Sequence, residues 1–324
     1  MRNLLYTVLG IAIITSFISP VYALTISPAK LEVTIDPGQI QVHEIELFNE
    51  QEDAKALYSS VENFEAQGES GAPHFTGANG GLATWITLTD SVIVGAGERV
   101  TVPFTINVPS NAKPGGYFAA VFFGSVPPQG SGGGEVNIGS KIGVLILLRV
   151  SGDVEEVAGL NEFSAKDGRK FFSTLPIQFG YAFNNQGGDR VVPGGEVKIK
   201  NTFRLTSATF FANERGGSVL PGSIRRLNVV WGDESYLRDE NKTGFFGTAW
   251  RQVKDFHLGW YTAQLNLSWG ETNIETAKAS YHFFIIPWQL LTILAFIIFL
   301  FGFIGRWGLK KYNRFIVAQA MRQR

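Results

Sequence analysis

The 324-residue chain contains no cysteine. This absence excludes disulfide bonds, thiol nucleophiles and cysteine-ligated metal sites. Exported domains often use disulfides, so any exported domain of this chain must be held together by its hydrophobic core alone. A core of sufficient size is feasible once a domain exceeds about 100 residues.

Catalytic motifs are also lacking. The histidines His43, His74, His257 and His282 show no metal-ligand spacing, and there is no nucleophile elbow, phosphate-binding loop or dinucleotide fingerprint. Adjacent acidic pairs would point to opposite faces of a strand and so would not cooperate. A pair of carboxylates from distant positions, as in a glycosidase, stays open. We therefore predict a protein that is not an enzyme and holds no metal or cofactor.

The chain has no net charge, but its charges are unevenly placed. There are 28 basic and 28 acidic residues. One basic residue lies in the first 23 residues and six lie after residue 305, which leaves 21 against 28 acids between them, a net charge of −7. Nucleic-acid binding depends largely on Lys and Arg that neutralise phosphates. We therefore expect no nucleic-acid partner.

One long uncharged run, Phe284–Ile304, stands near the C-terminus. A helix of about 20 residues spans roughly 30 Å, the thickness of the hydrocarbon core of a bilayer. The residues after it carry six Lys or Arg and no acid, a bias typical of the cytoplasmic side. We predict a single transmembrane helix at residues 283–305 and a basic cytoplasmic tail at residues 306–324.

The N-terminus has the pattern of a secretory signal peptide. Arg2 is followed by the apolar run Leu4–Ser19 and by a small-residue cleavage site that ends at Ala23. We predict a signal peptide at residues 1–23, cleavage between Ala23 and Leu24, and an outward-facing ectodomain held in the cell membrane by its end. The alternative is an uncleaved anchor, for which the apolar run is short.

Residues 24–154 show short strands separated by turn residues. The clearest is Val100–Val108, in which apolar residues alternate with Thr, Pro and Asn. Lys141–Val150 is a nearly continuous apolar strand, whereas Gly68–Gly81 and Gly124–Ser140 are predicted to be surface loops. About seven strands at this spacing are typical of a β-sandwich.

Residues 155–282 form a second unit with the same kind of pattern. Leu175–Phe183 and Tyr261–Trp269 alternate clearly. Gly232–Asp255 is polar and interrupted by glycine, which predicts a long loop or an irregular hairpin. We therefore predict an all-β ectodomain of two tandem immunoglobulin-like β-sandwiches, followed by one C-terminal transmembrane α-helix.

Several positions of the first domain follow a recognisable order: a Trp-Ile-x-Leu strand, a Gly-Glu turn, the alternating strand and an Ala-x-Pro-Gly turn. They are Asn49, Trp85, Ile86, Leu88, Gly97, Glu98, Val102, Phe104, Ile106, Val108, Pro109, Ala112, Pro114, Gly115, Tyr117, Ala119 and Val121. This order resembles the first ectodomain of the WxL-interacting proteins and, more broadly, the sandwiches of bacterial surface proteins and pilus chaperones. The resemblance implies that the first domain contacts peptidoglycan and the second a partner protein.

Four aromatic residues of the second domain are less easily assigned to its core. Phe245, Phe246, Trp250 and Trp260 lie in or beside the predicted loop Gly232–Asp255. One hypothesis is an exposed stacking platform for a glycan or a protein partner. The alternative is a satellite core beneath the loop.

Two functions of different classes fit these features. The first is a membrane-anchored cell-surface interaction protein that binds a cell-wall polymer, a glycan or another surface protein. The second is a membrane-tethered chaperone or assembly factor that acts on surface subunits by β-strand augmentation, for which Lys141–Val150 is a candidate strand. That strand fits a buried core position equally well. A third alternative for the whole protein is a plain structural spacer.

Overall fold

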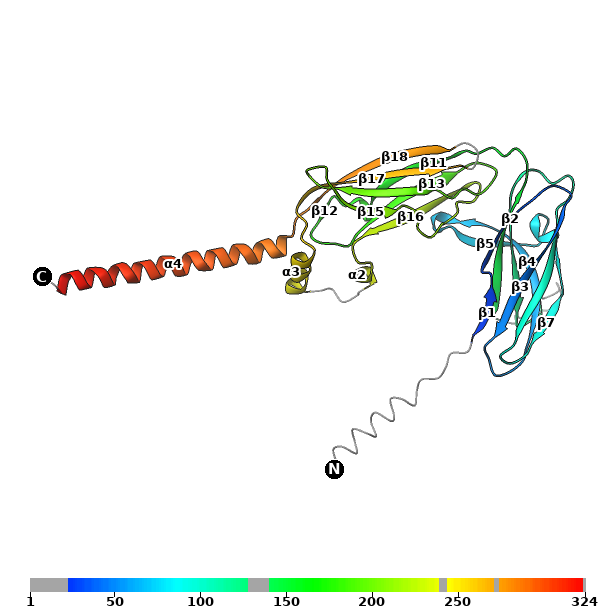
Figure 1. The fold of residues 1–324 in the computed structure, drawn as a ribbon, viewed down its shortest axis with the longest axis horizontal. Coiled ribbons are helices and arrows are strands. Elements are labelled where there is room, and N and C mark those ends of the chain that lie inside the picture. The colour runs from blue at the N-terminus through cyan, green and yellow to red at the C-terminus, as the bar shows by residue number, and fades with distance from the viewer. Residues whose placement is uncertain (1–22, 128–139, 239–243, 271–273, 323–324) are drawn as a thin grey trace, which may run out of the picture. The chain divides into compact units, whose positions relative to one another are not determined.

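The structure is a computed structural model that describes residues 23–127, 140–238, 244–270 and 274–322. Most of the predicted signal peptide and of the predicted Gly124–Ser140 loop lies outside the described residues. The chain divides into two compact units, Met1–Gln67 with Ala72–Glu155, and Gly68–Gly71 with Glu156–Arg324. Each unit contains an immunoglobulin-like β-sandwich, and one apolar helix follows the second (Figure 1). The predicted fold class is confirmed.

One sheet of the first unit has four antiparallel strands in the order β1-β3-β8-β6. They are β1 (Leu24–Ser27), β3 (Ile40–Asn49), β6 (Ile86–Leu88) and β8 (Arg99–Asn107). Pro103 of β8 lies one residue beyond the stretch that pairs with β6. Its missing backbone N–H therefore removes no hydrogen bond from the sheet.

The facing sheet has the strand order β2-β10-β9-β4-β5, and β7 also pairs with β4. The strands are β2 (Lys30–Ile35), β4 (Lys55–Gln67), β5 (Ala72–Gly77), β7 (Ser91–Val94), β9 (Gly115–Gly124) and β10 (Lys141–Val150). β2 and β10 are parallel, and the other pairs are antiparallel. The prediction of a loop over Gly68–Gly81 is wrong in part, because β5 lies within it. The residues of β5 show no strict alternation of apolar and polar side chains, but backbone pairing with β4 does not require any.

The core of the first unit is formed by the inward-facing residues of both sheets. Val102, Phe104 and Ile106 of β8 are buried and the residues between them are not, which confirms the predicted alternation. Ala119 and Val121 of β9 lie in the same cluster. One face of each strand is buried because successive side chains point to opposite sides of a sheet.

The second unit packs a three-stranded sheet, β11-β13-β16, against a five-stranded sheet, β12-β18-β17-β14-β15 (Figure 1). The strands are β11 (Ala158–Ala165), β12 (Phe171–Phe172), β13 (Ile177–Asn185), β14 (Gly194–Lys200), β15 (Thr206–Phe211), β16 (Ser223–Trp231), β17 (Gly259–Trp269) and β18 (Glu275–Ile285). β12 runs parallel to β18, and all other neighbours are antiparallel.

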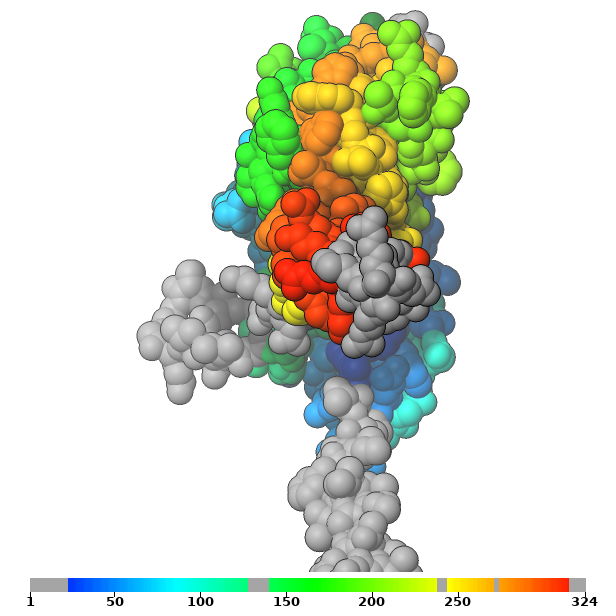
Figure 2. Space-filling model, turned by 90° about the vertical axis from the view of Figure 1, so that its left-hand side faces the viewer, coloured from blue at the N-terminus to red at the C-terminus, as the bar shows by residue number. Residues whose placement is uncertain are grey.

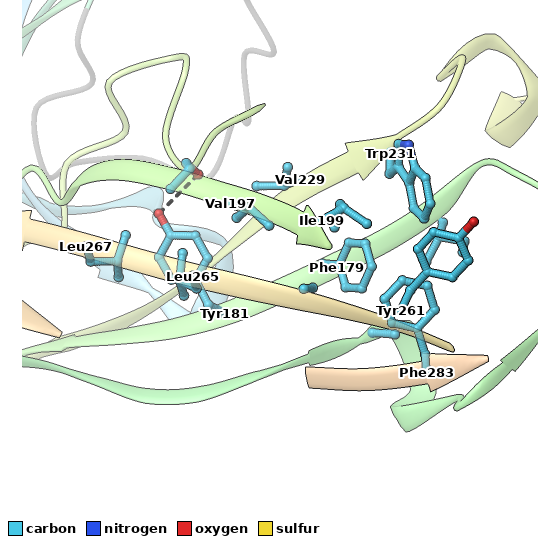
Figure 3. Packing of buried hydrophobic residues seen from close by; sticks show 14 of the residues in the cluster. Phe179, Tyr181, Val197, Ile199, Val229, Trp231, Tyr261, Leu265, Leu267 and Phe283 are labelled. Atoms are coloured by element: carbon cyan, nitrogen blue, oxygen red, sulfur yellow. Dashed lines mark hydrogen bonds between the residues drawn. The ribbon is translucent and has the colours of Figure 1, made fainter. Parts of the chain in front are cut away.

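Large aromatic side chains fill the core of the second unit (Figure 3). Phe179, Tyr181 and Phe283 are fully buried between the two sheets. The hydroxyl of Tyr181 donates a hydrogen bond to the carbonyl oxygen of Ala212 at 3.1 Å. Burial raises the pKa of Tyr181 above its usual range, so this hydroxyl stays protonated and keeps its donor role.

The two units share one strand plan. In the first, β1 pairs with β3, and the chain then crosses to the facing sheet and runs parallel to β10 as β2. In the second, β11 pairs with β13, and the chain then crosses and runs parallel to β18 as β12. The strand before the crossing has four residues in the first unit and eight in the second. The position of this crossing decides which sheet edge stays open.

A buried asparagine ends each of the equivalent strands β3 and β13. Asn49 and Asn185 are both fully buried. The side-chain amide of Asn49 donates to three backbone carbonyls and accepts one backbone N–H. Asn185 donates to two backbone carbonyls and accepts one backbone N–H. Each amide therefore ties its strand end to neighbouring loops.

Replacing either asparagine with alanine is expected to destabilise the unit that carries it by about 2 kcal/mol, because buried backbone groups lose their partners. Hydrogen exchange measured by mass spectrometry checks this, since faster exchange should be confined to the first unit for Asn49→Ala and to the second for Asn185→Ala. The exposed Asn228 on β16 supplies the control Asn228→Ala, which should leave exchange unchanged. Equal exchange in all three variants would contradict the assigned role.

The prediction of a loop over Gly232–Asp255 is wrong in part, because its described residues contain the helices α2 (Ser235–Arg238) and α3 (Phe245–Lys254), while residues 239–243 lie outside the described residues. Glycine and polar residues favour a loop locally. α3 forms because Ala249 and Gln252 lie on one helical face and are buried against the rest of the unit. Packing of that face outweighs the local preference.

The C-terminal helix α4 (Trp288–Arg322) begins four residues later than the apolar run. Phe284 and Ile285 instead end β18, where they pair with β12. Pro287 precedes the helix, and its carbonyl accepts the N–H of Leu291 at 3.0 Å. The stretch Trp288–Arg314 is long and apolar enough to cross a membrane, judged by its length and composition.

Candidate functional site

The first candidate site is the uncovered half of β3. This strand pairs with β8 along Ile40–Phe48, whereas β1 covers only Glu46–Asn49 on the other side. After Ser27 the chain leaves this sheet and continues as β2 in the facing one. Among the described residues, no strand therefore pairs with residues 40–45 on the side away from β8. We call this stretch the open edge.

Backbone directions show which groups the open edge presents. The N–H of Asn49 donates to Glu98, toward β8, whereas the N–H of Glu50 donates to Ala23, on the β1 side. Because such directions alternate along a strand, the even-numbered residues Ile40, Val42 and Glu44 point their N–H and C=O groups outward from the open edge. These backbone groups are available to an added strand.

The side chains at the open edge are partly apolar. Ile40 and Val42 lie on the outer face with exposed fractions of 61% and 65%. His43 points inward, with its ring centroid 5.7 Å from that of Phe104. Burial lowers the pKa of His43, which favours the neutral imidazole at neutral pH. The open edge thus carries only Glu44 as a charged residue pointing outward.

The strand Lys141–Val150 is a core strand in this structure. As β10 it pairs with β9 over its whole length and with β2 over Leu145–Val150. Only the stretch 141–144 has no partner on the β2 side within the part of the chain that the structure describes. Of the two positions left open for this strand, the structure shows the buried core position for its C-terminal six residues, because the crossing strand β2 covers them.

The second unit also has an uncovered edge, along β18. β12 pairs only with Phe284 and Ile285, so Glu275–Phe283 lacks a partner on that side among the described residues. The side chains of this edge that point away from the core are polar, and Lys278 lies among them. A lysine on an edge strand discourages pairing with another chain. The open edge of β3 carries no lysine, and Glu44 is its one outward-pointing charged residue.

The predicted aromatic residues lie at one end of the second unit. Phe245, Phe246 and Trp250 belong to α3. Trp260 is the second residue of β17 and lies beside Phe284 of β18, with ring centroids 5.0 Å apart. α3 lies next to the start of α4 (Figure 1). Phe246, Trp250 and Trp260 are more than half exposed, and Phe245 is 38% exposed. The structure brings all four to the end at which β18 leads into the C-terminal helix.

Sequence reasoning missed further exposed apolar residues at this end. We define the apolar collar as six residues whose exposed fractions lie between 58% and 81%: Phe171, Phe203, Leu205, Phe246, Trp250 and Trp260. Phe203 and Leu205 lie in the turn between β14 and β15, and Phe171 begins β12. No local sequence signal joins them, because they come from four separate elements.

The described residues offer little for catalysis. They contain no group of three or more His, Cys, Asp or Glu that could hold a metal ion. The pKa of Glu162 is lowered by hydrogen bonds from Arg226 and Ser164, but this carboxylate lies on the surface. A lowered carboxyl pKa in a surface ion pair is what ordinary charge pairing produces.

No protein-family model matches this chain, and no curated protein matches it. The resemblance to the WxL-interacting proteins therefore stays a prediction. Among solved structures, the class 5 fimbriae chaperone CfaA is 11% identical with a TM-score of 0.37, over 81% of this chain and 99% of that chain.

Two further chaperone structures are similar to the chain at the same level. The E. coli chaperone DraB is 9% identical with a TM-score of 0.35, over 80% of this chain and 98% of that chain. In the CsuC–CsuE chaperone–tip subunit complex of Acinetobacter baumannii, the matched chain is 10% identical with a TM-score of 0.34, over 66% of this chain and 91% of that chain. Likeness at this level says nothing about a partner or an activity of this chain.

Proposed function

We propose that the protein is a membrane-tethered, non-enzymatic docking protein that binds an extended segment of another surface protein by strand addition. The observation that carries this proposal is the open edge of β3, with Ile40 and Val42 exposed on its outer face. The first sandwich presents the edge, and α4 holds the chain in the membrane. This is an assembly or chaperone role rather than catalysis.

Strand addition uses the physical chemistry that the open edge offers. An added strand would pair with the backbone groups of Ile40, Val42 and Glu44, each bond contributing about 1 kcal/mol net. Its alternate side chains would pack on Ile40 and Val42, so a partner segment with apolar residues at every second position fits best. Glu44 favours a basic residue at the corresponding position of the partner.

The proposed location follows from the ends of the chain. The apolar part of α4 crosses the membrane, and the basic residues after it favour the cytoplasmic side. The two sandwiches then lie outside the cytoplasm, where the partner would be another exported protein. The proposal also includes a signal peptide at residues 1–23, which would direct the chain to export.

A proline at Val42 is expected to abolish capture of the partner while the fold is retained. It removes one outward N–H from the open edge and no bond to β8, and Pro103 shows that this sheet accepts a proline facing no partner strand. The chain has no native cysteine, so a single cysteine can carry a label. A photo-activated cross-linker is attached to Val42→Cys or Ile40→Cys in the full chain, and cell-envelope membranes that contain the labelled protein are irradiated. A single protein adduct is expected from Ile40→Cys and none once Val42→Pro is added.

Matched controls separate strand addition from a general surface effect. Ile93 lies in the same unit and is 72% exposed, so Ile93→Lys should leave the adduct unchanged while Val42→Lys removes it. Cross-linking to cell-wall polymer alone would favour wall binding. Absence of any adduct from the open edge would leave the spacer role and sink the proposal.

A further inference from the structure

The elements that carry the apolar collar come together at the end of the second unit where α4 begins. Figure 2 views this end of the second unit, with α4 in red toward the viewer and the yellow and orange residues of α3, β17 and β18 around its base. β17 begins here, β18 ends here, and the β14–β15 turn lies beside Trp260. The collar therefore lies at the level where the apolar run of α4 starts.

Direct contacts hold α3 at this level. Gln252 is buried, and its side-chain amide donates to the carbonyl of Ser173 at 3.0 Å and to the side chain of Gln289 in α4. Its oxygen accepts the N–H of Leu290 at 2.9 Å. The ring of Phe245 lies 5.7 Å from that of Trp288, the first residue of α4. Any membrane that α4 crosses must therefore begin close to α3.

The exposed face of α3 is apolar. Phe246, Trp250 and Val253 follow the i, i+4, i+7 spacing of one helical face, and all three are exposed. The opposite face, with Ala249 and Gln252, packs against the rest of the unit. A surface helix facing water places polar residues outward, so this orientation indicates an apolar surrounding. Aromatic rings of this kind are enriched where lipid headgroups meet acyl chains.

The strand side of the collar is held rigidly. The hydroxyl of Thr202 donates to the carbonyl of Trp260 at 3.0 Å and accepts its N–H at 3.1 Å. The side-chain oxygen of Asn201 accepts the N–H groups of Phe203 and Leu205, both at 3.0 Å. These hydrogen bonds hold the turn in a conformation that leaves two apolar side chains exposed, which is costly in water.

We propose that the apolar collar lies in the headgroup–acyl boundary of the bilayer that α4 crosses, so that the second sandwich rests on the membrane. The partner surface is phospholipid, because the collar is continuous with the apolar part of α4. This inference rests on the proposed membrane span. It assigns the predicted stacking residues Phe246, Trp250 and Trp260 to lipid rather than to a glycan.

The test uses the full chain with single cysteines, which the native sequence lacks. Phe203→Cys and Phe246→Cys are labelled with a polarity-sensitive fluorophore and reconstituted in phosphatidylcholine vesicles that contain spin-labelled lipid. Phe299→Cys in α4 reports on the span. Phe211→Cys is the matched control, because Phe211 is 74% exposed but lies away from the collar. It is aligned across the sheet with Asn266, which lies about 20 Å along β17 from Trp260.

Labels at 203 and 246 are expected to lose emission in spin-labelled vesicles as the label at 299 does, while the label at 211 keeps its emission. Phe246→Glu should restore emission at 203, and Phe211→Glu should not. Quenching at 299 without quenching at 203 and 246 would overturn the collar and leave the span intact. No quenching at 299 would overturn the span itself. If cell-wall fragments, and not lipid, change the emission of the labels at 203 and 246, the glycan-binding hypothesis for these residues would be favoured instead.

Discussion

Replacing Gly195 with alanine is expected to unfold the second sandwich. Gly195 lies in β14 with a φ of +135°, a conformation that side chains rarely adopt. An added Cβ would lie 2.1 Å from the backbone oxygen of Asn266 in the paired strand β17, where only backbone could move away. The expected cost is about 4 kcal/mol, at the upper end for single substitutions.

The neighbouring glycine provides the control for this prediction. A Cβ at Gly194 would meet only the backbone oxygen of Ser268, at an ordinary 3.7 Å. Gly194→Ala should therefore change the free energy of unfolding by less than about 0.5 kcal/mol. Urea unfolding of the full chain in detergent, followed by tryptophan fluorescence, measures both. Of the seven tryptophans only Trp85 lies in the first unit, so the signal reports on the second. Equal midpoints for the two variants would refute the steric argument.

The second large effect is expected from Phe283→Ala in β18. Phe283 is fully buried, and its ring lies 5.4 Å from Phe179 and 5.8 Å from Tyr261, measured between centroids. It also lies 6.1 Å from Trp231 and so joins both sheets (Figure 3). Deleting a fully buried phenylalanine leaves a cavity and costs about 3–5 kcal/mol.

The adjacent residue supplies the control for the cavity. Phe284 points to the other face of the same strand and contacts Trp260 and Phe171 outside the core. Phe284→Ala should therefore cost far less, about 1 kcal/mol, because little buried volume is lost. The same unfolding measurement applies. A midpoint shift for Phe284→Ala as large as that for Phe283→Ala would mean that the outer aromatic row, not the core, holds this strand.

Some elements were predictable because their signal is local. Val100–Val108 alternates strictly, and the structure makes it β8 with its apolar face in the core. Lys141–Val150 appears as β10 with the predicted bounds. A strand that is half buried requires every second residue to be apolar, and a strand buried on both faces requires a continuous run. These requirements are visible in a window of ten residues.

Other elements were missed because local preference was outweighed by packing. α3 lies in a stretch with glycines at 244 and 247, yet burial of Gln252 and its contacts with the first turn of α4 stabilise a helix there. β5 has no alternation and depends on backbone pairing with β4. Neither interaction can be read from the segment itself, since each depends on a partner more than a few residues away in the chain.

The candidate sites depend even more strongly on distant contacts. The open edge exists because β1 stops pairing with β3 at Ser27 and the chain crosses to the facing sheet. No sequence pattern around Ile40 or Val42 reveals this choice of pairing. The apolar collar gathers residues from four elements at the base of α4. The sequence by itself determined the all-β class, the two units and the apolar C-terminal helix, because alternation and length act locally. The tertiary structure alone decided which strand edge stays uncovered and which exposed aromatics meet, because both follow from long-range pairing and register.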